Sequence, residues 1–221
     1  MVLDLLLPQR CVVCARSGAN VCRECERALR RIGPPLCERC GAPTAWPVRR
    51  CRECAGRRLA FATARACVEY DEAARAIVGA WKERGLRRLA AWAADVVAAE
   101  LTAPTVEVIT FVPADRSRSL QRGHHTAEAL ARELAERWEL PVGETLRRTR
   151  ASPRQRGLDH AGRRRNVRGA FAAPQRVRPR ILLVDDVYTT GATVAAAASA
   201  LRAAGARYVA VATFARTIRV R

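Results

Sequence analysis

The sequence predicts an α/β protein, in which a parallel sheet flanked by helices follows a small cysteine-rich domain. Strand-like and helix-like segments alternate from residue 64 onward, and near the C-terminus a strand, a loop, a helix and a strand follow one another. Eight of the nine cysteines lie before residue 55. Because 221 residues suffice for one ordinary domain and a small one, we expect two domains, residues 1–58 and 59–221.

The composition favours a globular protein outside the membrane. Apolar residues make up 49% of the chain, but no apolar run approaches the ~18–20 residues that span a bilayer. The first ten residues carry Asp4, their apolar stretch is short, and no small-residue cleavage site follows. We therefore expect neither membrane insertion nor secretion, and a cytoplasmic location.

The cysteine-rich segment contains four C-x-x-C knuckles. Both thiolates of such a turn point to one spot, which suits a tetrahedral zinc ion better than a disulfide framework. The segment has few large aliphatic residues to form a core, so it needs another source of stability, such as bound zinc. Four knuckles predict two structural zinc sites with these eight ligands: Cys11, Cys14, Cys22, Cys25, Cys37, Cys40, Cys51 and Cys54.

The pairing of the knuckles stays open at this point. Sequential pairing joins the first two knuckles and the last two, whereas crossed pairing alternates them. The break at Pro34 and Pro35 favours sequential pairing. Cys67 lies alone in an apolar strand-like run, and we expect it in the core.

The rest of the chain alternates between strands and helices. Buried strands read as apolar runs, and amphipathic helices as periodic ones. We expect strands over residues 64–70, 106–112, 181–184 and 208–214, and helices over residues 72–81, 86–101, 125–138 and from about 193 to 204.

The most specific pattern is an acidic pair between a strand and a Thr/Gly loop. Asp185 and Asp186 follow the apolar run 181–184, and the loop 189–193 opens an alanine-rich helix. In open parallel sheets, ligands bind beyond the carboxyl ends of strands, and a helix N-terminus attracts phosphate. Two carboxylates suit a sugar diol or a metal ion, so the pattern predicts a ribose 5-phosphate site.

The net charge of +19 rests almost entirely on arginine, since Lys82 is the only lysine among 40 basic residues. A coding bias explains a general excess of arginine but not its distribution. Residues 147–180 contain 12 arginines and a single acidic residue. This local concentration needs a further cause, and a nucleic acid or another phosphate ligand is a candidate.

The run LLVDDVYTTGAT at residues 182–193 closely resembles the phosphoribosyl-pyrophosphate (PRPP) motif of type I phosphoribosyltransferases. Val112-Pro113, Arg122-Gly123 and the runs at 155–158 and 163–171 extend the likeness. With its four knuckles, nearly the whole chain resembles the ComF family of competence-associated proteins. The resemblance implies a type I phosphoribosyltransferase-like sheet behind a double zinc ribbon.

The resemblance also implies a PRPP site with Mg²⁺ nearby. Asp185 and Asp186 would hold the ribose hydroxyls, and an arginine-rich hood over residues 147–168 would close on the pyrophosphate. The 5-phosphate loop would comprise Thr189, Thr190, Gly191, Ala192 and Thr193. The pyrophosphate loop would comprise Pro113, Ala114, Asp115 and Arg116.

Lys82 is the most specific single prediction. It lies in a helix end that resembles a Leu-Lys-Tyr-x-Gly run of the ComF family. A compact ammonium that survives a strong bias toward arginine suggests a role that guanidinium cannot fill, so we expect Lys82 at the ligand edge.

The sequence departs from the family at residues 124–126. Family members commonly carry Arg-Gly-Phe-Asn-Gln where this chain continues Arg122-Gly123 with His124, His125 and Thr126. The two histidines could act as a ligand or a general base, but we expect them to supply partly exposed polarity at a helix start. Thr189 stands where purine-type transferases place an acid, which disfavours purine salvage of that kind.

Two functions remain open. The first is an enzyme that transfers phosphoribose from PRPP, or another phosphoribosyl ligand, to an unknown acceptor. The second is a non-catalytic PRPP-binding factor that handles single-stranded DNA in competence, with competence-machinery proteins as partners. The low aromatic content, 5%, weakens base stacking in the second.

Overall fold

The computed structural model describes residues 9–114, 124–149 and 169–218. The elements in these ranges are α2 (Arg23–Arg27), β1 (Thr63–Glu69), α3 (Glu72–Glu83), α4 (Leu89–Glu100), β2 (Val108–Phe111), α6 (Thr126–Trp138), β3 (Arg147–Arg148), β4 (Phe171–Ala172), β5 (Arg180–Tyr188), α8 (Ala192–Ala203) and β6 (Tyr208–Arg216).

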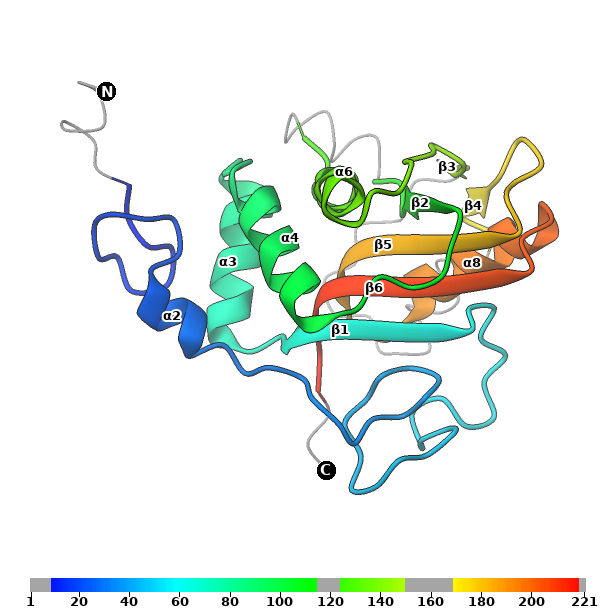
Figure 1. The fold of residues 1–221 in the computed structure, drawn as a ribbon, viewed down its shortest axis with the longest axis horizontal. Coiled ribbons are helices and arrows are strands. Elements are labelled where there is room, and N and C mark those ends of the chain that lie inside the picture. The colour runs from blue at the N-terminus through cyan, green and yellow to red at the C-terminus, as the bar shows by residue number, and fades with distance from the viewer. Residues whose placement is uncertain (1–8, 115–123, 150–168, 219–221) are drawn as a thin grey trace.

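Four of these strands form one parallel sheet in the order β1-β6-β5-β2 (Figure 1). β5 lies inside the sheet between β6 and β2, whereas β3 and β4 form a separate antiparallel pair. Each parallel connection needs a crossover, which the intervening helices supply. The predicted fold class, a parallel sheet flanked by helices behind a cysteine-rich N-terminal part, is confirmed.

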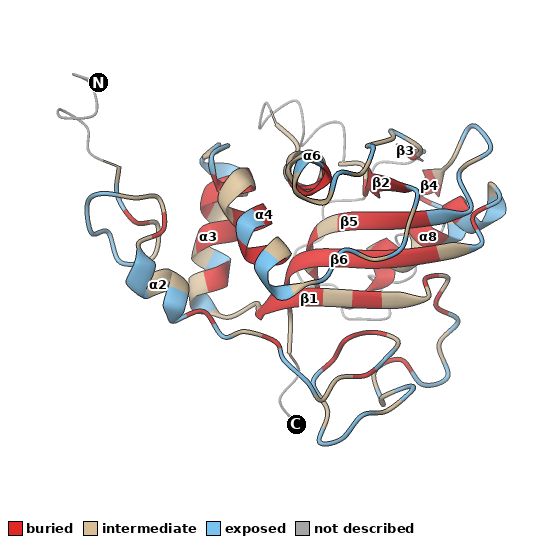
Figure 2. Cartoon of the chain, viewed as in Figure 1, coloured by how far each residue is buried: buried red, intermediate tan, exposed pale blue. Residues whose placement is uncertain are grey.

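The two faces of the sheet are covered by different helices. Leu182 and Val184 of β5 pack with α3, α4 and α6. Ile181 and Leu183, which alternate with them, pack with α8 on the opposite face. Figure 2 shows β5 and β6 buried along their central part, whereas the edge strand β1 alternates between buried and intermediate segments. A near-continuous apolar strand such as β5 is what burial on both faces requires.

β5 is longer than the sequence indicated. The apolar run ends at Val184, but the strand continues to Tyr188 and therefore contains the acidic pair. The reason is its neighbour: β6 runs to Arg216, and its ladder with β5 extends to the Tyr188–Arg216 pair. β2 stops earlier, at Phe111 opposite Val184, so the last residues of β5 are open on that side.

The cysteine-rich segment contains turns and one short helix, α2. Its second half docks directly on the edge of the sheet. Gly41 has φ +67°, and a Cβ atom there would lie 2.4 Å from the Ala64 carbonyl oxygen of β1. Only glycine permits this approach. The domain boundary at residues 58/59 stays a prediction.

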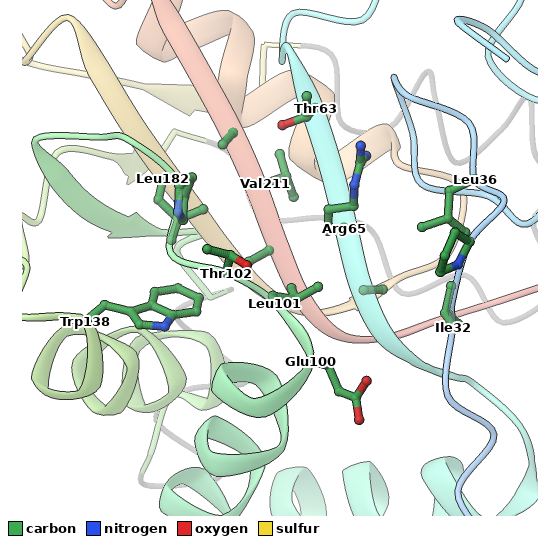
Figure 3. Close-up of a pocket in the computed structure, with 15 residues that line it drawn as sticks. Ile32, Leu36, Thr63, Arg65, Glu100, Leu101, Thr102, Trp138, Leu182 and Val211 are labelled. Carbon is green, nitrogen blue, oxygen red and sulfur yellow. The ribbon is translucent and has the colours of Figure 1, made fainter. Parts of the chain in front are cut away.

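A pocket of about 330 Å³ lies near the amino ends of the strands, opposite to the end that carries the acidic pair (Figure 3). Leu101, Thr102 and Trp138 line one side, and Ile32 and Leu36 the other. None of the predicted site residues lines this pocket. Within the described ranges, no helix has the length and apolar character needed to cross a membrane.

Candidate functional site

The predicted site lies where the carboxyl ends of β5 and β2 meet. After β2 the chain enters α6 on one face of the sheet, and after β5 it enters α8 on the other. The loops that leave two neighbouring strands toward opposite faces open a crevice, which is the usual ligand position in such sheets. The fold therefore places Asp185 and Asp186 at a topological switch point.

The acidic pair is held by groups from two helices. The Lys82 ammonium at the end of α3 lies 2.6 Å from Oδ1 of Asp186. The Thr126 hydroxyl at the start of α6 donates to Oδ2 of the same carboxylate at 2.5 Å. The Asp186 backbone N–H donates to Asp185 Oδ1 at 3.0 Å. Lys82 thus lies beside the acidic pair, and its part in ligand binding stays a prediction.

The two carboxylates differ in protonation. Burial alone would raise the pKa of Asp186, but the adjacent Lys82 ammonium and the Thr126 donor outweigh it and lower that pKa. Burial, followed by the charge of Asp186, raises the pKa of Asp185 to about 7. Near neutral pH the site therefore contains one firmly ionised carboxylate beside one that readily exchanges a proton.

The loop after β5 enters α8 through a left-handed glycine. Gly191 is the N-cap of α8 and has φ +69°, a left-handed conformation that favours glycine. Thr190 is buried, and its hydroxyl accepts the Ala192 N–H at 3.3 Å. The Tyr188 ring packs directly under Gly191, where a Cβ atom would lie 2.2 Å from the phenol oxygen. The first N–H groups of α8 have no intrahelical partner and face this loop.

The structure describes only some of the other predicted site residues. Pro113 and Ala114 follow β2 and lie beside the acidic pair, because the Val112 N–H donates to the Val184 carbonyl at 3.0 Å. Asp115 and Arg116 lie outside the described residues, as do residues 150–168 of the predicted hood.

The histidine pair is partly buried at the start of α6, in agreement with the prediction. His125 is the N-cap, and its Nδ1 accepts the Glu128 N–H at 3.0 Å. Burial lowers the His125 pKa. His124 Nε2 lies 2.6 Å from the Trp81 carbonyl oxygen. Both rings thus support the helix start that carries Thr126.

The eight knuckle cysteines form two tetrads, and the pairing is sequential. In each tetrad the four sulfur atoms lie within 4.8 Å of one another. The Cys14–Cys22, Cys37–Cys54, Cys40–Cys51 and Cys51–Cys54 sulfur pairs are 3.4 to 3.9 Å apart. A tetrahedral shell with Zn–S near ~2.3 Å needs sulfur atoms about 3.8 Å apart, so both donor sets fit structural zinc. Site 1 comprises Cys11, Cys14, Cys22 and Cys25, and site 2 comprises Cys37, Cys40, Cys51 and Cys54.

Backbone donors favour the thiolate form of one cysteine in each site, whereas burial raises the pKa of Cys25, Cys40 and Cys54. Burial raises the pKa of Cys11 and of Cys37, but N–H donors outweigh it and lower these pKa values to about 6 and about 7. The Cys22 N–H lies 3.4 Å from Cys11 Sγ, and the Cys51 N–H lies 3.3 Å from Cys37 Sγ. Cys67 is fully buried in the core outside both tetrads, as predicted, and burial raises its pKa.

Two contacts of the site were not predicted. Thr126 lies in the run that departs from the family, and its pairing with Asp186 had no local signal. Arg216 ends the apolar strand β6, is 1% exposed, and contacts site 2 through the Cys40 carbonyl and the Glu53 carboxylate. Its only sequence signal is a charged residue after an otherwise apolar strand.

Comparisons with known proteins found a match to the cysteine-rich N-terminal part and relatives over nearly the whole chain. Residues 2–67 match the family model described as a double zinc ribbon domain. Over 231 residues the chain is 29% identical to the DNA utilization protein YhgH of Salmonella typhi, covering 97% of this chain and 100% of the relative. It is 27% identical to competence protein F of Haemophilus influenzae, covering 91% of this chain and 94% of the relative.

A solved structure shows a more limited likeness. Glutamine phosphoribosylpyrophosphate (PRPP) amidotransferase of B. subtilis, in complex with ADP and GMP, superimposes with a TM-score of 0.38 and 25% identity. The match covers 57% of this chain and 25% of that chain. On its N-terminal match and its near full-length relatives, the chain carries a double zinc ribbon and is homologous to the ComF/YhgH competence proteins.

Proposed function

We propose that the chain binds PRPP, or another ester of ribose 5-phosphate, together with Mg²⁺ at the carboxyl end of β5. One observation carries the proposal: the acidic pair Asp185–Asp186 and the Gly191 loop follow one another at the carboxyl end of β5, and the loop opens directly into the N-terminus of α8. A binding site for a diol next to a binding site for a phosphate matches the two ends of a ribose 5-phosphate.

The loop would hold the 5-phosphate. The N-terminal N–H groups of a helix and its dipole attract an anion, and the left-handed Gly191 lets the backbone approach it closely. The hydroxyls of Thr189, Thr190 and Thr193 add donors. Their part in binding rests on their positions in the PRPP-like run.

The acidic pair would hold the ribose hydroxyls and Mg²⁺, a hard cation that prefers carboxylate oxygens. Mg²⁺ bound with PRPP would screen the charge of the phosphates. Asp186 is already ionised, whereas Asp185 would lose its proton when the cation arrives, because a bound cation lowers the pKa of a nearby acid. Lys82 would keep Asp186 in place and add positive charge at the same edge.

The same site would support transfer as well as binding. In transfer, the bond from ribose C1 to the pyrophosphate oxygen breaks, pyrophosphate leaves, and C1 bonds to the acceptor nucleophile, whose proton goes to a base. The pyrophosphate would lie near Pro113 and Ala114, with Asp115, Arg116 and the hood residues as further contacts. Pyrophosphate release from PRPP, measured across candidate acceptors, separates transfer from binding alone.

Calorimetric titration with Mg²⁺ and PRPP tests the site. In the double variant Asp185→Asn/Asp186→Asn, we expect affinity to fall at least about a hundredfold, since both charged acceptors are lost. Asp95→Asn is the matched control, because Asp95 is an exposed carboxylate on α4 that pairs with Arg137. Zinc content should stay at two ions per chain in all variants. Equal affinity in the double variant and in the control would refute the site.

A second function, contact with single-stranded DNA, is favoured by Trp46. Its side chain is 69% exposed, and among the described residues it is the one exposed large apolar side chain. Arg49 and Arg50, both exposed, follow it on the site 2 ribbon. An aromatic platform beside cations fits stacked bases and their phosphates. Relatives that are named DNA utilization and competence proteins agree with this proposal.

Trp46→Ala tests the second function. We expect single-stranded oligonucleotide binding to weaken by about 1–3 kcal/mol, the typical contribution of one base stacked on an aromatic ring. The salt dependence of binding should stay steep, because the phosphate contacts remain. Unchanged oligonucleotide affinity in this variant would exclude Trp46 as a stacking platform.

A further inference from the structure

A buried arginine joins both knuckles of site 2 to the sheet. The Arg216 guanidinium donates through Nη1 to the Cys40 carbonyl oxygen, and through Nη2 to a Glu53 carboxylate oxygen at 3.0 Å. Cys40 belongs to the first knuckle of the site, and Glu53 lies inside the second, between Cys51 and Cys54. One side chain therefore holds the two halves of the zinc site against the end of β6.

The same guanidinium contacts the residue that supports the phosphate loop. Its central carbon lies 4.8 Å from the centroid of the Tyr188 ring. Tyr188 is 3% exposed, pairs with Arg216 in the β5–β6 ladder, and packs edge-on against Phe61. With this ring fixed from both sides, its position is determined by the ribbon and by the sheet together.

The Tyr188 ring in turn lies against the loop. The close approach to Gly191 leaves no room for a side chain there, so the ring forms the floor on which the left-handed turn rests. Site 2, Arg216, Tyr188 and Gly191 thus form one contiguous series of contacts. The ribbon that carries site 1 has no part in it, since it packs with α3 and α4 on the other face.

We propose that Arg216 and Tyr188 are positioning residues that couple zinc in site 2 to the phosphate loop, so that zinc loading there favours binding of the 5-phosphate. The inference rests on the proposed PRPP site. The coupling requires an element with two states, and the site 2 ribbon is that element: it is ordered with zinc and loses its order without zinc, as zinc knuckles of this kind do. Without zinc, Cys40 and Glu53 no longer hold the guanidinium, and the floor under the loop loses one of its supports.

Coupling between two binding sites is reciprocal. If zinc in site 2 raises the affinity for the ligand, then the ligand must raise the zinc affinity of site 2 by the same factor and leave that of site 1 unchanged. The two sites of one chain therefore provide an internal control. We expect saturating Mg²⁺ and PRPP to raise the zinc affinity of one of the two sites at least about fivefold, the lower range of such couplings.

The experiment measures, at equilibrium, how much zinc the full chain loses to a competing coloured chelator, with and without Mg²⁺ and PRPP. Arg216→Met keeps an unbranched side chain but removes the donors, and should abolish the protection by PRPP. Arg137→Met is the matched control, because Arg137 also donates to a backbone carbonyl and a carboxylate, but between α4 and α6. If Arg216→Met does not retain zinc, Glu53→Gln weakens the same contact more mildly and should reduce the protection.

The outcomes separate the two proposals. PRPP that binds, as calorimetry detects, and protects one ion in the wild type but not in Arg216→Met supports the coupling. PRPP that binds and protects neither ion, or both equally, overturns the coupling and leaves the binding site standing. Full protection in Arg216→Met overturns the assignment to that residue. PRPP that does not bind overturns the proposed function and the coupling with it.

Discussion

The two zinc sites share the C-x-x-C pattern but are embedded differently. In site 1, Cys14 is exposed and only Cys11 is buried, and its ribbon contacts the rest of the protein mainly through Val21, Leu29 and a Trp92–Glu26 hydrogen bond of 2.9 Å. In site 2, three of four cysteines are buried within the cluster that contains α8. The spacing of the cysteines thus identifies the zinc ligands, but it does not indicate how much the stability of the protein depends on each site.

Removal of one thiolate from each site should show the largest difference. Cys54→Ser should lose the site 2 zinc and lower the free energy of unfolding by about 5 kcal/mol or more, a fraction of the roughly 10–16 kcal/mol that structural zinc supplies. Cys14→Ser, at the exposed site, should cost clearly less, because fewer core contacts depend on it. Thermal unfolding with metal analysis measures both, and equal losses would remove the distinction between the sites.

The arginine contacts of the two ribbons differ in the same direction. Arg216→Met leaves the Cys40 carbonyl and Glu53 without their donor, so we expect a loss of about 3 kcal/mol in urea unfolding. Arg16 pairs with Glu24 on the first ribbon, with both side chains more than 60% exposed. Arg16→Met should therefore change stability by less than about 1 kcal/mol. A similar loss in both variants would contradict the burial argument.

The face that carries site 1 reaches the proposed PRPP site through the ends of α3 and α6. Lys82→Arg keeps the charge, but a planar guanidinium does not fit the short contact to Asp186 in the same way. We expect PRPP affinity to fall more than about tenfold with zinc content unchanged. The PRPP affinity of Lys82→Met should fall further. An unchanged affinity in Lys82→Arg would show that any cation suffices at this position.

The pH dependence of PRPP binding should follow Asp185 and not the zinc sites. The pKa of Asp185, raised to about 7, means that this carboxyl is protonated below neutral pH, where it opposes a cation. From pH 8 to pH 6 we expect affinity for Mg²⁺ and PRPP to fall about tenfold, the effect of one proton over this range. Asp185→Asn should flatten this part of the profile, whereas Cys14→Ser should leave it intact. A profile identical in Asp185→Asn would assign the titration to PRPP itself.

The parts predicted from sequence are those encoded locally. The knuckle cysteines, the apolar runs of the strands and the acidic pair before a Thr/Gly loop are short patterns whose spacing dictates their geometry. The structure confirms the parallel sheet and settles sequential pairing of the knuckles. The ligand-binding roles of the acidic pair and the loop stay predictions.

The parts that sequence could not give depend on distant neighbours. Thr126 meets Asp186 across 60 residues, and Arg216 meets Cys40 across 176. Such contacts follow from strand order and register, which no local pattern specifies. The end of β5 is a similar case, because the strand continues past its apolar run only where β6 continues beside it.

A crystal structure with Mg²⁺ and PRPP would show whether the carboxyl end of β5 holds the ligand. We expect the 5-phosphate in the loop 189–193, the ribose hydroxyls against Asp185 and Asp186, and two zinc ions in the cysteine tetrads. Phosphate density elsewhere, with the acidic pair still closed by Lys82 and Thr126 alone, would contradict this expectation.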